Sequence, residues 1–475
     1  MDAIERYDIL ILGGGKAGKT LAMDQARGGK RVALVEAGMI GGSCINIACI
    51  PTKTLVRTAQ VARLAKGAAA FGVVTRGEPG VDMRRVAART AEVVAGMVEV
   101  NAKALAASGL ELVLGWGRFV EPRVIEAVGE WGVRRLTADR IYLDLGTRAA
   151  IPPVPGLREV EPLTHVEALT LDVLPTHLLV IGGGYIGMEM AQAFRHLGAE
   201  VTIIEHGPQL AAREDADVAT AIQDLFRADG IELVLNARIA EVSGRSGEVV
   251  TVRLEDGQAI AGSHVLVAAG REPMTGDIGL DIAGVSLDAR GFITVDERLA
   301  TSAPGIWALG EVAGSPMFTH VSLDDYRVAK SGIAGGTRTT RDRLVPYAVF
   351  IEPEFARVGI GEREAEHAGV PYRLASLVMD AVPRARTLSE RTGFMKALVG
   401  DDDRILGFAM LGAQAGEVMA TVQMAMLGSL PYTVLRDAIV AHPTLTEGLN
   451  MLFGELTPYA SNPGKMKVIE QDAVK

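Results

Sequence analysis

The feature that most constrains the fold is a glycine pattern that occurs twice in the same context. Each copy follows a short apolar run of buried-strand type (DILIL, then HLLVI), and the copies are 169 residues apart (182 minus 13). The glycines are Gly13, Gly15 and Gly18 in the first copy and Gly182, Gly184 and Gly187 in the second. Glycine at this spacing lets backbone N–H groups approach a phosphate at the start of a helix.

An acidic residue completes each copy. The next strand ends in Glu36 after the first copy and in Glu205 after the second, each eighteen residues after the last glycine. A carboxylate at that position accepts ribose hydroxyls. The segment Gly18-Lys19-Thr20 also fits a P-loop, but a P-loop does not need the acid and the second copy lacks this segment. The sequence therefore predicts two dinucleotide-binding folds.

The chain has only two cysteines, and they are five positions apart in GGSCINIACIPTK. A regular helix would place the α-carbons of Cys44 and Cys49 about 8.6 Å apart, beyond ordinary disulfide reach. Gly41-Gly42 before the pair and Pro51 after it indicate a distorted turn instead. We therefore expect a strained, reducible disulfide. Two packed free thiols are the alternative.

Composition limits the possible partners and compartment. A net charge of −10 and a pI near 5.5 argue against nucleic-acid and anionic-membrane partners. We find no signal peptide and no apolar run long enough to span a membrane. A cytoplasmic protein is expected, and a disulfide there is usually transient and catalytic.

The 475 residues suggest about three domains in an α/β chain. IPPVPG and AAGREP mark two places where the chain crosses between domains, and the composition changes again near residue 345. We predict a discontinuous first dinucleotide domain (1–150 and 271–344), a second (151–270) and a C-terminal α+β unit (345–475). Long helices are expected at 81–108 and 416–430, a further helix at 432–440, and a poorly ordered tail after Pro458.

These features together resemble the FAD-dependent pyridine nucleotide–disulfide oxidoreductases over nearly the whole chain. The most specific match is G-G-x-C-x4-C-x-P-[ST]-K at 41–53, and AHPTLTEGLN at 441–450 resembles the family's C-terminal His-Pro-Thr…Glu element. The resemblance implies that the first fold binds FAD and the second NAD(P)H. Two electrons would then pass through the flavin to a Cys44–Cys49 disulfide.

The resemblance also implies roles for individual residues. Cys49 would lie against the flavin and Cys44 would meet the acceptor, while Lys53 and Glu189 would form an ion pair beside the flavin. Tyr185 would gate the nicotinamide, although a packed tyrosine is the plainer interpretation. His442, oriented by Glu447, would act as base toward the cysteines of the other subunit in a homodimer. The further contacts implied are Gly13, Gly15, Gly18, Glu36, Lys53, Gly310 and Glu311 for FAD, and Gly182, Gly184, Tyr185, Gly187, Glu205 and Gly270 for NAD.

Two positions depart from the family pattern, and one predicts the coenzyme. Glu311 stands where the family usually has an aspartate, and Asp144 begins an unusual Asp-Leu-Gly-Thr turn in place of small residues. Glu311 keeps the carboxylate and stays a predicted FAD contact, whereas Asp144 is assigned no flavin role. Glu205 should repel a 2′-phosphate, so we predict a preference for NADH, with NADPH possible.

The acceptor is the least constrained part of the prediction. KAGKTLA, SLDDYR, PRAR and LPYTVLRDAI resemble the RclA-type copper(II) reductases of bacterial reactive-chlorine resistance. Cys44 and Cys49 would then receive copper transiently as soft thiolates. Dihydrolipoyl dehydrogenase is the alternative. Mercuric reductase is disfavoured because its extra C-terminal cysteines are missing, and a non-catalytic redox sensor because every catalytic position is filled.

Overall fold

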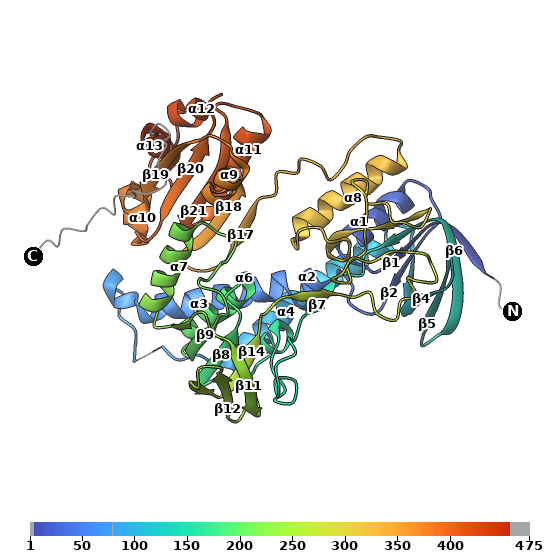
Figure 1. Cartoon of the computed structure of the whole chain (residues 1–475), viewed down its shortest axis with the longest axis horizontal. Coiled ribbons are helices and arrows are strands. Elements are labelled where there is room, and N and C mark those ends of the chain that lie inside the picture. The colour runs from blue at the N-terminus through green and yellow to red at the C-terminus, as the bar shows by residue number, and fades with distance from the viewer. Residues whose placement is uncertain (1–3, 78, 457–475) are drawn as a thin grey trace, which may run out of the picture. The chain divides into compact units, whose positions relative to one another are not determined.

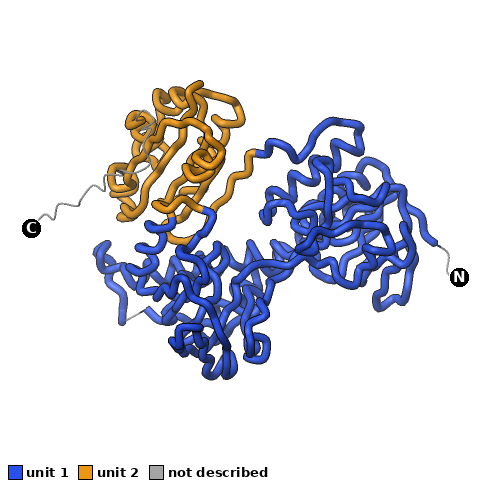
Figure 2. Tube along the Cα trace, in the orientation of Figure 1, with its two compact units in different colours: residues 1–213, 219–343 blue, residues 214–218, 344–475 orange. Residues whose placement is uncertain are grey.

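The computed structural model describes residues 4–77 and 79–456, so the predicted disordered tail after Pro458 lies outside them. The chain forms two compact units (Figures 1 and 2). Unit 1 comprises Met1–Arg213 and Ala219–Arg343, and unit 2 comprises Glu214–Val218 and Leu344–Lys475. The predicted C-terminal boundary at 345 lies one residue from the start of the second part of unit 2. The separate segment 214–218 was not expected from the sequence.

A large, mainly parallel sheet in unit 1 carries the first glycine pattern. Its strand order is β3-β2-β1-β6-β5-β4, and β16 pairs with β6. Strands β3, β2, β1, β6 and β16 run parallel, whereas β4 and β5 add an antiparallel meander. The bounds are β1 Glu5–Leu12, β2 Val32–Glu36, β3 Glu111–Leu114, β4 Trp116–Glu121, β5 Val124–Gly129, β6 Gly132–Leu143 and β16 Ile306–Ala308. The second half of β1, from Ile9 to Leu12, is apolar and buried, and β2 is buried throughout, as expected for parallel strands with both faces covered.

The second glycine pattern lies in a parallel sheet of order β10-β9-β8-β14. A three-stranded antiparallel sheet and a two-stranded ribbon complete unit 1. The bounds are β8 His177–Ile181, β9 Glu200–Ile204, β10 Glu232–Val234 and β14 His264–Val267 for the parallel sheet, β11 Ile239–Gly244, β12 Val250–Leu254 and β13 Ala259–Gly262 for the antiparallel sheet, and β7 Thr147–Ala149 and β15 Arg271–Pro273 for the ribbon. Each glycine pattern therefore follows a parallel strand, as the sequence predicted. These strands, β1 and β8, each lie between two other strands of their sheet.

Helices cover these sheets and position the cysteines. Helices α1 and α8 pack against each other through Ala17, Leu21 and Val328. The helices of unit 1 are α1 Lys16–Arg27, α2 Ser43–Asn46, α3 Cys49–Lys66, α4 Met83–Ala106, α5 His165–Ala168, α6 Tyr185–Leu197 and α8 Thr319–Ile333, with short 3-10 turns at Ala68–Phe71 and Gly310–Ala313. The helix predicted over 81–108 is confirmed as α4. No helix in the described ranges is both long and apolar enough to cross a bilayer.

Unit 2 is an antiparallel sheet with helices, the α+β arrangement expected from the sequence. The strand order is β17-β18-β21-β20-β19, and the division between the units passes through α7 (Ala216–Ala228). The other elements of unit 2 are β17 Tyr347–Val349, β18 Glu354–Gly359, β19 Arg373–Val378, β20 Phe394–Val399, β21 Ile405–Gly412, α9 Glu362–Ala368, α10 Pro383–Leu388, α11 Ala415–Leu427, α12 Tyr432–Asp437 and α13 Gly448–Gly454, with a 3-10 turn at Met379–Ala381. The expected helices at 416–430 and 432–440 correspond to α11 and α12.

Candidate active site

The first glycine loop joins β1 to α1 with no room for side chains. A Cβ on Gly13, whose φ is +97°, would lie 2.3 Å from the Asp144 carbonyl oxygen. A Cβ on Gly18 would lie 2.6 Å from the Gly13 carbonyl oxygen. Glycine is required at both positions because the loop turns sharply and α1 starts directly against β1. The backbone N–H groups at the start of α1 are thereby exposed to a phosphate.

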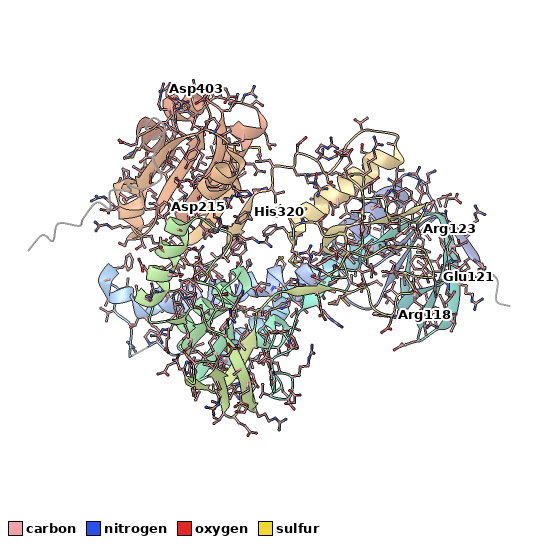
Figure 3. The ribbon with its side chains drawn as sticks, in the orientation of Figure 1. Arg118, Glu121, Arg123, Asp215, His320 and Asp403 are labelled. Atoms are coloured by element: carbon pink, nitrogen blue, oxygen red, sulfur yellow. The ribbon has the colours of Figure 1, made fainter. Side chains whose placement is uncertain are left out.

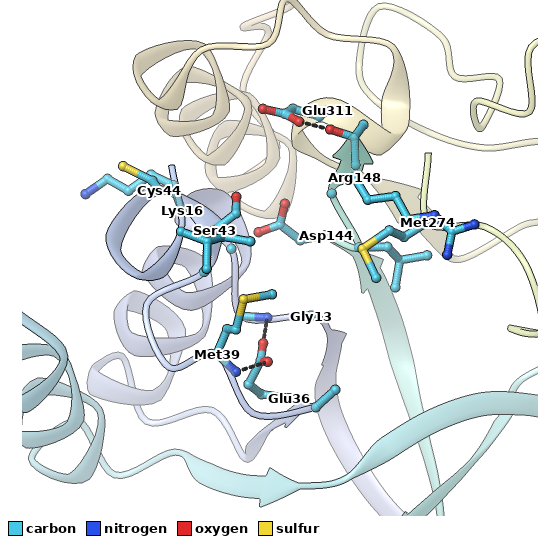
Figure 4. A pocket seen from close by; sticks show the side chains of 18 of the residues that line it. Gly13, Lys16, Glu36, Met39, Ser43, Cys44, Asp144, Arg148, Met274 and Glu311 are labelled. Carbon is cyan, nitrogen blue, oxygen red and sulfur yellow. Dashed lines mark hydrogen bonds between the residues drawn. The ribbon is translucent and has the colours of Figure 1, made fainter. Parts of the chain in front are cut away.

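Glu36 connects this loop to the end of β2. Its Oε2 accepts a hydrogen bond from the Gly14 amide at 2.7 Å. Its Oε1 accepts from the amides of Gly38 and Met39, both at 2.9 Å. The carboxylate is buried at the edge of the cavity drawn in Figure 4. Glu36 therefore shapes the loop as well as offering charge to a ligand.

The second copy has the same construction. A Cβ on Gly182 would lie 2.5 Å from the Ala268 carbonyl oxygen. Glu205 accepts from the amides of Gly183 at 2.6 Å and Gly207 at 2.7 Å. The exposed His206 ring lies 2.8 Å from Glu205 Oε1. The duplication seen in the sequence is thus a duplication of loop geometry.

Four further positions predicted to contact NAD lie around this second loop. Gly184 caps α6, Tyr185 is its first residue, and Gly187 lies in its first turn. A Cβ on Gly187 would lie 2.1 Å from the Gly182 carbonyl oxygen. Gly270 follows β14 with a φ of +133°, a conformation that favours glycine. Their roles toward a nucleotide stay predictions.

A cavity of about 300 Å³ extends along the first loop. Its lining includes the amide-rich Gly13–Gly15 turn, the Glu36 carboxylate, the Cys44 thiol and Glu311 (Figure 4). This set fits an extended flavin dinucleotide, because it offers donors for phosphates, a carboxylate for a ribose and a thiol for the redox end. The chemistry of the lining is therefore compatible with FAD.

The cysteine segment breaks between two helices. Helix α2 ends at Asn46 and α3 starts at Cys49, with Ala48 at φ −130° and ψ −101° between them. Pro51 falls in the first turn of α3, where its missing N–H has no intrahelical partner to lose. The distorted turn expected from the flanking residues is present. Both cysteines are free thiols here, so the disulfide itself stays a prediction.

The two thiols are electrostatically unequal. The Cys44 thiol hydrogen-bonds to Cys49, and this bond raises the pKa of Cys44 and lowers that of Cys49. Thr319 Oγ1, 3.4 Å from Cys49 Sγ, and the charge of Lys53 also lower the Cys49 pKa. The reduced pair therefore places its first negative charge on Cys49, the thiol predicted to face the flavin. In the cavity itself, Cys44 rather than Cys49 contributes to the lining.

Lys53 and Glu189 form the predicted ion pair. Lys53 Nζ donates to Glu189 Oε2 at 2.6 Å and thereby connects α3 to α6. The Glu189 side chain is only 6% exposed, so a cation nearby offsets the cost of burying its charge.

The turn at Gly310-Glu311 is anchored to α8 by a hydrogen bond. The Gly310 amide donates to the fully buried carboxylate of Asp325 at 2.7 Å. Glu311 lies at the cavity, accepts a short hydrogen bond from the Thr147 hydroxyl, and is 3.4 Å from Arg271 Nε. Glu311 is thus near the predicted FAD, but its carboxylate is already engaged by two side chains.

Asp144 is the second departure from the family pattern. Its Oδ2 accepts from the Gly18 amide at 2.6 Å, and it lines the same cavity. Burial raises the pKa of this carboxyl to about 7, with Asp325, Glu311 and Glu36 adding to the effect. Asp144 therefore supports the glycine loop directly.

His442 and Glu447 belong to unit 2 and lie between α12 and α13. His442 Nδ1 is 2.8 Å from Glu447 Oε2, and the imidazole is 71% exposed whereas the carboxylate is 12% exposed. A buried carboxylate on one ring nitrogen fixes the tautomer and leaves the other nitrogen free to face a partner. The structure brings these two residues together as the sequence predicted.

Among the described residues, a single group of acids could geometrically hold a metal ion. It consists of Asp215, Asp217 and Glu362 in unit 2, and Asp215 is labelled in Figure 3. Lys396 Nζ lies 2.8 Å from Asp215, 2.8 Å from Asp217 and 2.9 Å from Glu362. The buried ammonium group occupies the position of a cation, so this cluster is an ion-pair network.

Two dinucleotide folds beside a cysteine pair define the class of flavoprotein disulfide reductases, and the comparisons agree. The family model for pyridine nucleotide-disulphide oxidoreductase matches residues 7–325, and the family's dimerisation-domain model matches residues 345–452. The chain therefore belongs to the pyridine nucleotide-disulphide oxidoreductases. It is an enzyme of a family that uses FAD and a pyridine nucleotide.

Several relatives match over nearly their full length. The chain is 37% identical to the probable pyridine nucleotide-disulfide oxidoreductase RclA of Escherichia coli, covering 95% of this chain and 99% of the relative. It is 34% identical to a dihydrolipoyl dehydrogenase of Thermus scotoductus, covering 94% and 96%. A solved Cu(II) complex of the HOCl-induced flavoprotein disulfide reductase RclA from Escherichia coli superposes with a TM-score of 0.87, 37% identity and coverage of 95% and 99%.

The sequence did not predict the residues that hydrogen-bond to the backbone of the site and hold it in place. Ser322 accepts from the Ala17 amide at 3.1 Å, and Asp325 holds Gly310. Both lie in SLDDYR, a stretch that the resemblance had marked without a role. Lys19 belongs to the apparent P-loop and is only 4% exposed. No sequence signal distinguishes a buried lysine from a solvated one.

Proposed function

We propose that this enzyme passes electrons from NADH to copper(II) through a bound FAD and the Cys44–Cys49 pair, in defence against reactive chlorine. The observation that carries the proposal is the pair of neighbouring thiols in the distorted turn between α2 and α3, of which Cys44 lines the cavity. The similarity to the Escherichia coli RclA, solved as a Cu(II) complex, supports this acceptor.

FAD, when bound, supplies the two-electron chemistry that links a nicotinamide to the cysteine pair. The residues of the chain do the rest. Cys49 and Cys44 take up two electrons and pass from the disulfide to a thiol and a thiolate. Two copper(II) ions then each accept one electron, the disulfide re-forms, and the remaining thiol proton is released. Thiolates suit this step because soft sulfur ligands favour copper(I).

Lys53 and Glu189 would keep the charge balanced next to the flavin. Lys53 lies one helical turn after Cys49 on α3, so its ammonium group can act on both the thiolate and a negatively charged ring. Tyr185, at the start of α6, would cover the nicotinamide site until the nucleotide enters. Glu205 would accept the ribose hydroxyls of NADH and disfavour the phosphate of NADPH.

His442 with Glu447 would accept the proton of the exposed thiol. Because the chain matches the family's dimerisation-domain model, we propose a homodimer in which His442 of one subunit acts on the cysteines of the other. Each active site would then be incomplete in a monomer. A cytoplasmic location is in keeping with a cysteine pair that must be reduced in every cycle.

Dihydrolipoyl dehydrogenase activity is the second candidate, favoured by the full-length match to the Thermus enzyme. The deciding experiment measures NADH oxidation by the FAD-loaded enzyme with copper(II), lipoamide, glutathione disulfide and mercury(II). Copper-dependent turnover at least tenfold above that with lipoamide supports the proposal. Rapid lipoamide turnover with negligible copper reduction contradicts it and selects the second candidate.

The route through the cysteines needs its own control. Cys44→Ser and Cys49→Ser should each abolish copper reduction while FAD stays bound. Thr58→Ser, a conservative change on the same helix α3, should leave turnover unchanged. Full activity in both cysteine variants would mean that the acceptor takes electrons directly from the flavin.

A further inference from the structure

The first turn of α1 contains a buried lysine that the reaction scheme does not use. Lys19 is 4% exposed, and its Nζ donates to the Gly41 carbonyl oxygen at 3.1 Å and to Asn101 Oδ1 at 2.6 Å. Neither acceptor carries a charge. Burying an ammonium group among neutral partners is costly, and burial lowers the pKa of Lys19 to about 8. The charge of Lys19 is therefore not neutralised by its hydrogen-bond partners.

The hydrogen bond to Gly41 places Lys19 directly beneath the cysteine turn. Gly41, at φ +98°, lies three residues before Cys44. The next residue, Gly42, packs so closely on the first glycine loop that a Cβ would lie 2.9 Å from Gly15 Cα. A Cβ on Gly41 would itself lie 3.5 Å from Lys19 Nζ. Lys19 therefore packs against the segment that leads into the cysteine turn and hydrogen-bonds to its backbone.

The charge of Lys19 acts on one sulfur in particular. The hydrogen bond to Cys49 and burial raise the pKa of Cys44 overall, and the charge of Lys19 acts against this increase; a Cys44 thiolate in turn raises the pKa of Lys19. The charge of Lys53 acts in the same direction on Cys49, where Glu189 opposes it. Around Lys19 the other charged groups are Lys16, which opposes its protonation, and Asp144, which favours it. The two sulfurs thus have separate cations, on α1 and on α3.

We propose that Lys19 is a positioning residue that favours the reduced form of the Cys44–Cys49 pair. The inference rests on the proposed function, because it requires the pair to cycle between disulfide and dithiol. A disulfide is neutral, whereas the reduced pair carries negative charge. A fixed cation beneath the Cys44 segment stabilises the negative charge of the hydrogen-bonded reduced pair, which lies mainly on Cys49, and has little to stabilise in the disulfide. Lys19 would therefore raise the reduction potential of the pair, which makes reduction of the Cys44–Cys49 disulfide more favourable.

The test measures the redox equilibrium of the pair rather than turnover. The FAD-loaded enzyme is equilibrated with dithiothreitol buffers at fixed pH, where dithiothreitol becomes a cyclic disulfide as the Cys44–Cys49 disulfide becomes two thiols. The samples are quenched with an alkylating agent, and the reduced fraction of the peptide carrying both cysteines is measured by mass spectrometry. In Lys19→Gln we expect the equilibrium constant for reduction to fall about tenfold, which is about 30 mV for a two-electron couple.

Matched variants separate charge from packing. Lys19→Gln loses the charge but keeps a hydrogen-bond donor, whereas Lys19→Met loses both. If the charge is what matters, the equilibrium constant for reduction should fall equally in the two variants. Asn101→Asp keeps the shape of α4 and places a carboxylate beside Lys19, so it should shift the equilibrium in the same direction without touching Lys19. Lys103→Gln removes an exposed positive charge from the same helix and should stay within twofold of the parent.

The outcomes are distinct. An unchanged equilibrium in both Lys19→Gln and Asn101→Asp would overturn the inference, as would a shift in Lys19→Met alone. Should Lys19→Gln fail to fold, Asn101→Asp decides by itself. If the parent enzyme formed no reversible disulfide in these buffers, the proposed function would fail first, and this result is separate from the comparison among variants.

Discussion

Lys53 Nζ lies 2.6 Å from Glu189 Oε2 and joins the helix that begins at Cys49 to the helix that follows the second glycine loop. The glutamate side chain is 6% exposed and the lysine side chain 33% exposed. The pair is therefore a link between the redox-active segment and the second dinucleotide fold, made by residues that are 136 positions apart.

The free energy of this link is accessible to a double-mutant cycle. Lys53→Met removes the 2.6 Å ion pair with the buried Glu189 carboxylate, and we expect it to destabilise the enzyme by about 2 kcal/mol, less than for a fully buried pair because Lys53 is partly exposed. Lys53→Met combined with Glu189→Gln should be more stable than Lys53→Met alone. Urea denaturation of the FAD-loaded protein measures the coupling. Simple additivity of the two changes would show that the pair contributes nothing.

The parts of this site that could be predicted from the sequence are those encoded by residues close together in the chain. Gly13 to Glu36 and Gly182 to Glu205 follow a local spacing rule, so both loops were found in register. Cys44 and Cys49 stood out because the chain has no other cysteines. In contrast, Asp325 supports Gly310 from a separate helix, and no local pattern encodes that contact.

Burial of charge was equally invisible in the sequence. Lys19 resembled part of a P-loop, and its 4% exposure follows from the packing of α1, α4 and the cysteine turn. The segment 214–218 was expected to lie within the second dinucleotide domain, yet it groups with unit 2, where Asp217 contacts Lys396, 179 residues later in the chain. Such contacts depend on tertiary structure, where propensity and spacing carry no information.

Glu205 should set the coenzyme preference. Glu205→Gln removes the negative charge and replaces one acceptor oxygen with an amide donor that faces a backbone N–H. We expect the apparent Kd for NADH to rise about tenfold and the preference for NADH over NADPH to fall by a similar factor. Stopped-flow reduction of the flavin with each nucleotide measures both quantities.

The first copy offers the matched control for this change. Glu36 makes the same two kinds of backbone contact, at 2.7 Å and 2.9 Å. Glu36→Gln should therefore weaken FAD retention and leave the ratio between the two nicotinamide nucleotides as it is. Equal shifts of that ratio in both variants would mean that the effect of Glu205 is a general loosening of the fold.

Asp144 should make stability depend on pH. Its carboxyl pKa is raised by burial from 3.8 to about 7, so the folded protein holds a proton that the unfolded chain has lost. The stability that this proton provides is complete below about pH 4 and is lost as the pH rises through 7. Because each pKa unit is about 1.4 kcal/mol, the loss reaches as much as about 4 kcal/mol by pH 8.

Asp144→Asn should remove this dependence, since the amide is neutral at every pH and can still accept from Gly18. Thermal midpoints of the variant and parent, both with FAD bound, should be similar at pH 4 and should favour the variant at pH 8. Asp139→Asn, at an exposed aspartate, is the control for the loss of one carboxylate. If the thermal midpoints of Asp144→Asn and the parent differed by the same amount at both pH values, Asp144 would not be the source of the pH dependence.

The exposed imidazole of His442 makes subunit sharing directly testable. Two inactive enzymes, Cys44→Ser and His442→Gln, are co-expressed with different affinity tags, and the mixed dimer is isolated. If His442 serves the cysteines of the other subunit, the mixed dimer has one site with both changes and one site with neither. It should then recover about half of the parent turnover, because one of its two sites is intact.

If instead each subunit were self-sufficient, every site in the mixed dimer would carry one change, and it would be as inactive as its parents. The matched control pairs Cys44→Ser with Cys49→Ser. Both changes lie in the same segment, so each site of that mixed dimer carries one of them under either arrangement and no activity should return. Recovery in the first mixture but not in the second would place His442 and Glu447, 2.8 Å apart on one subunit, in the active site of the other.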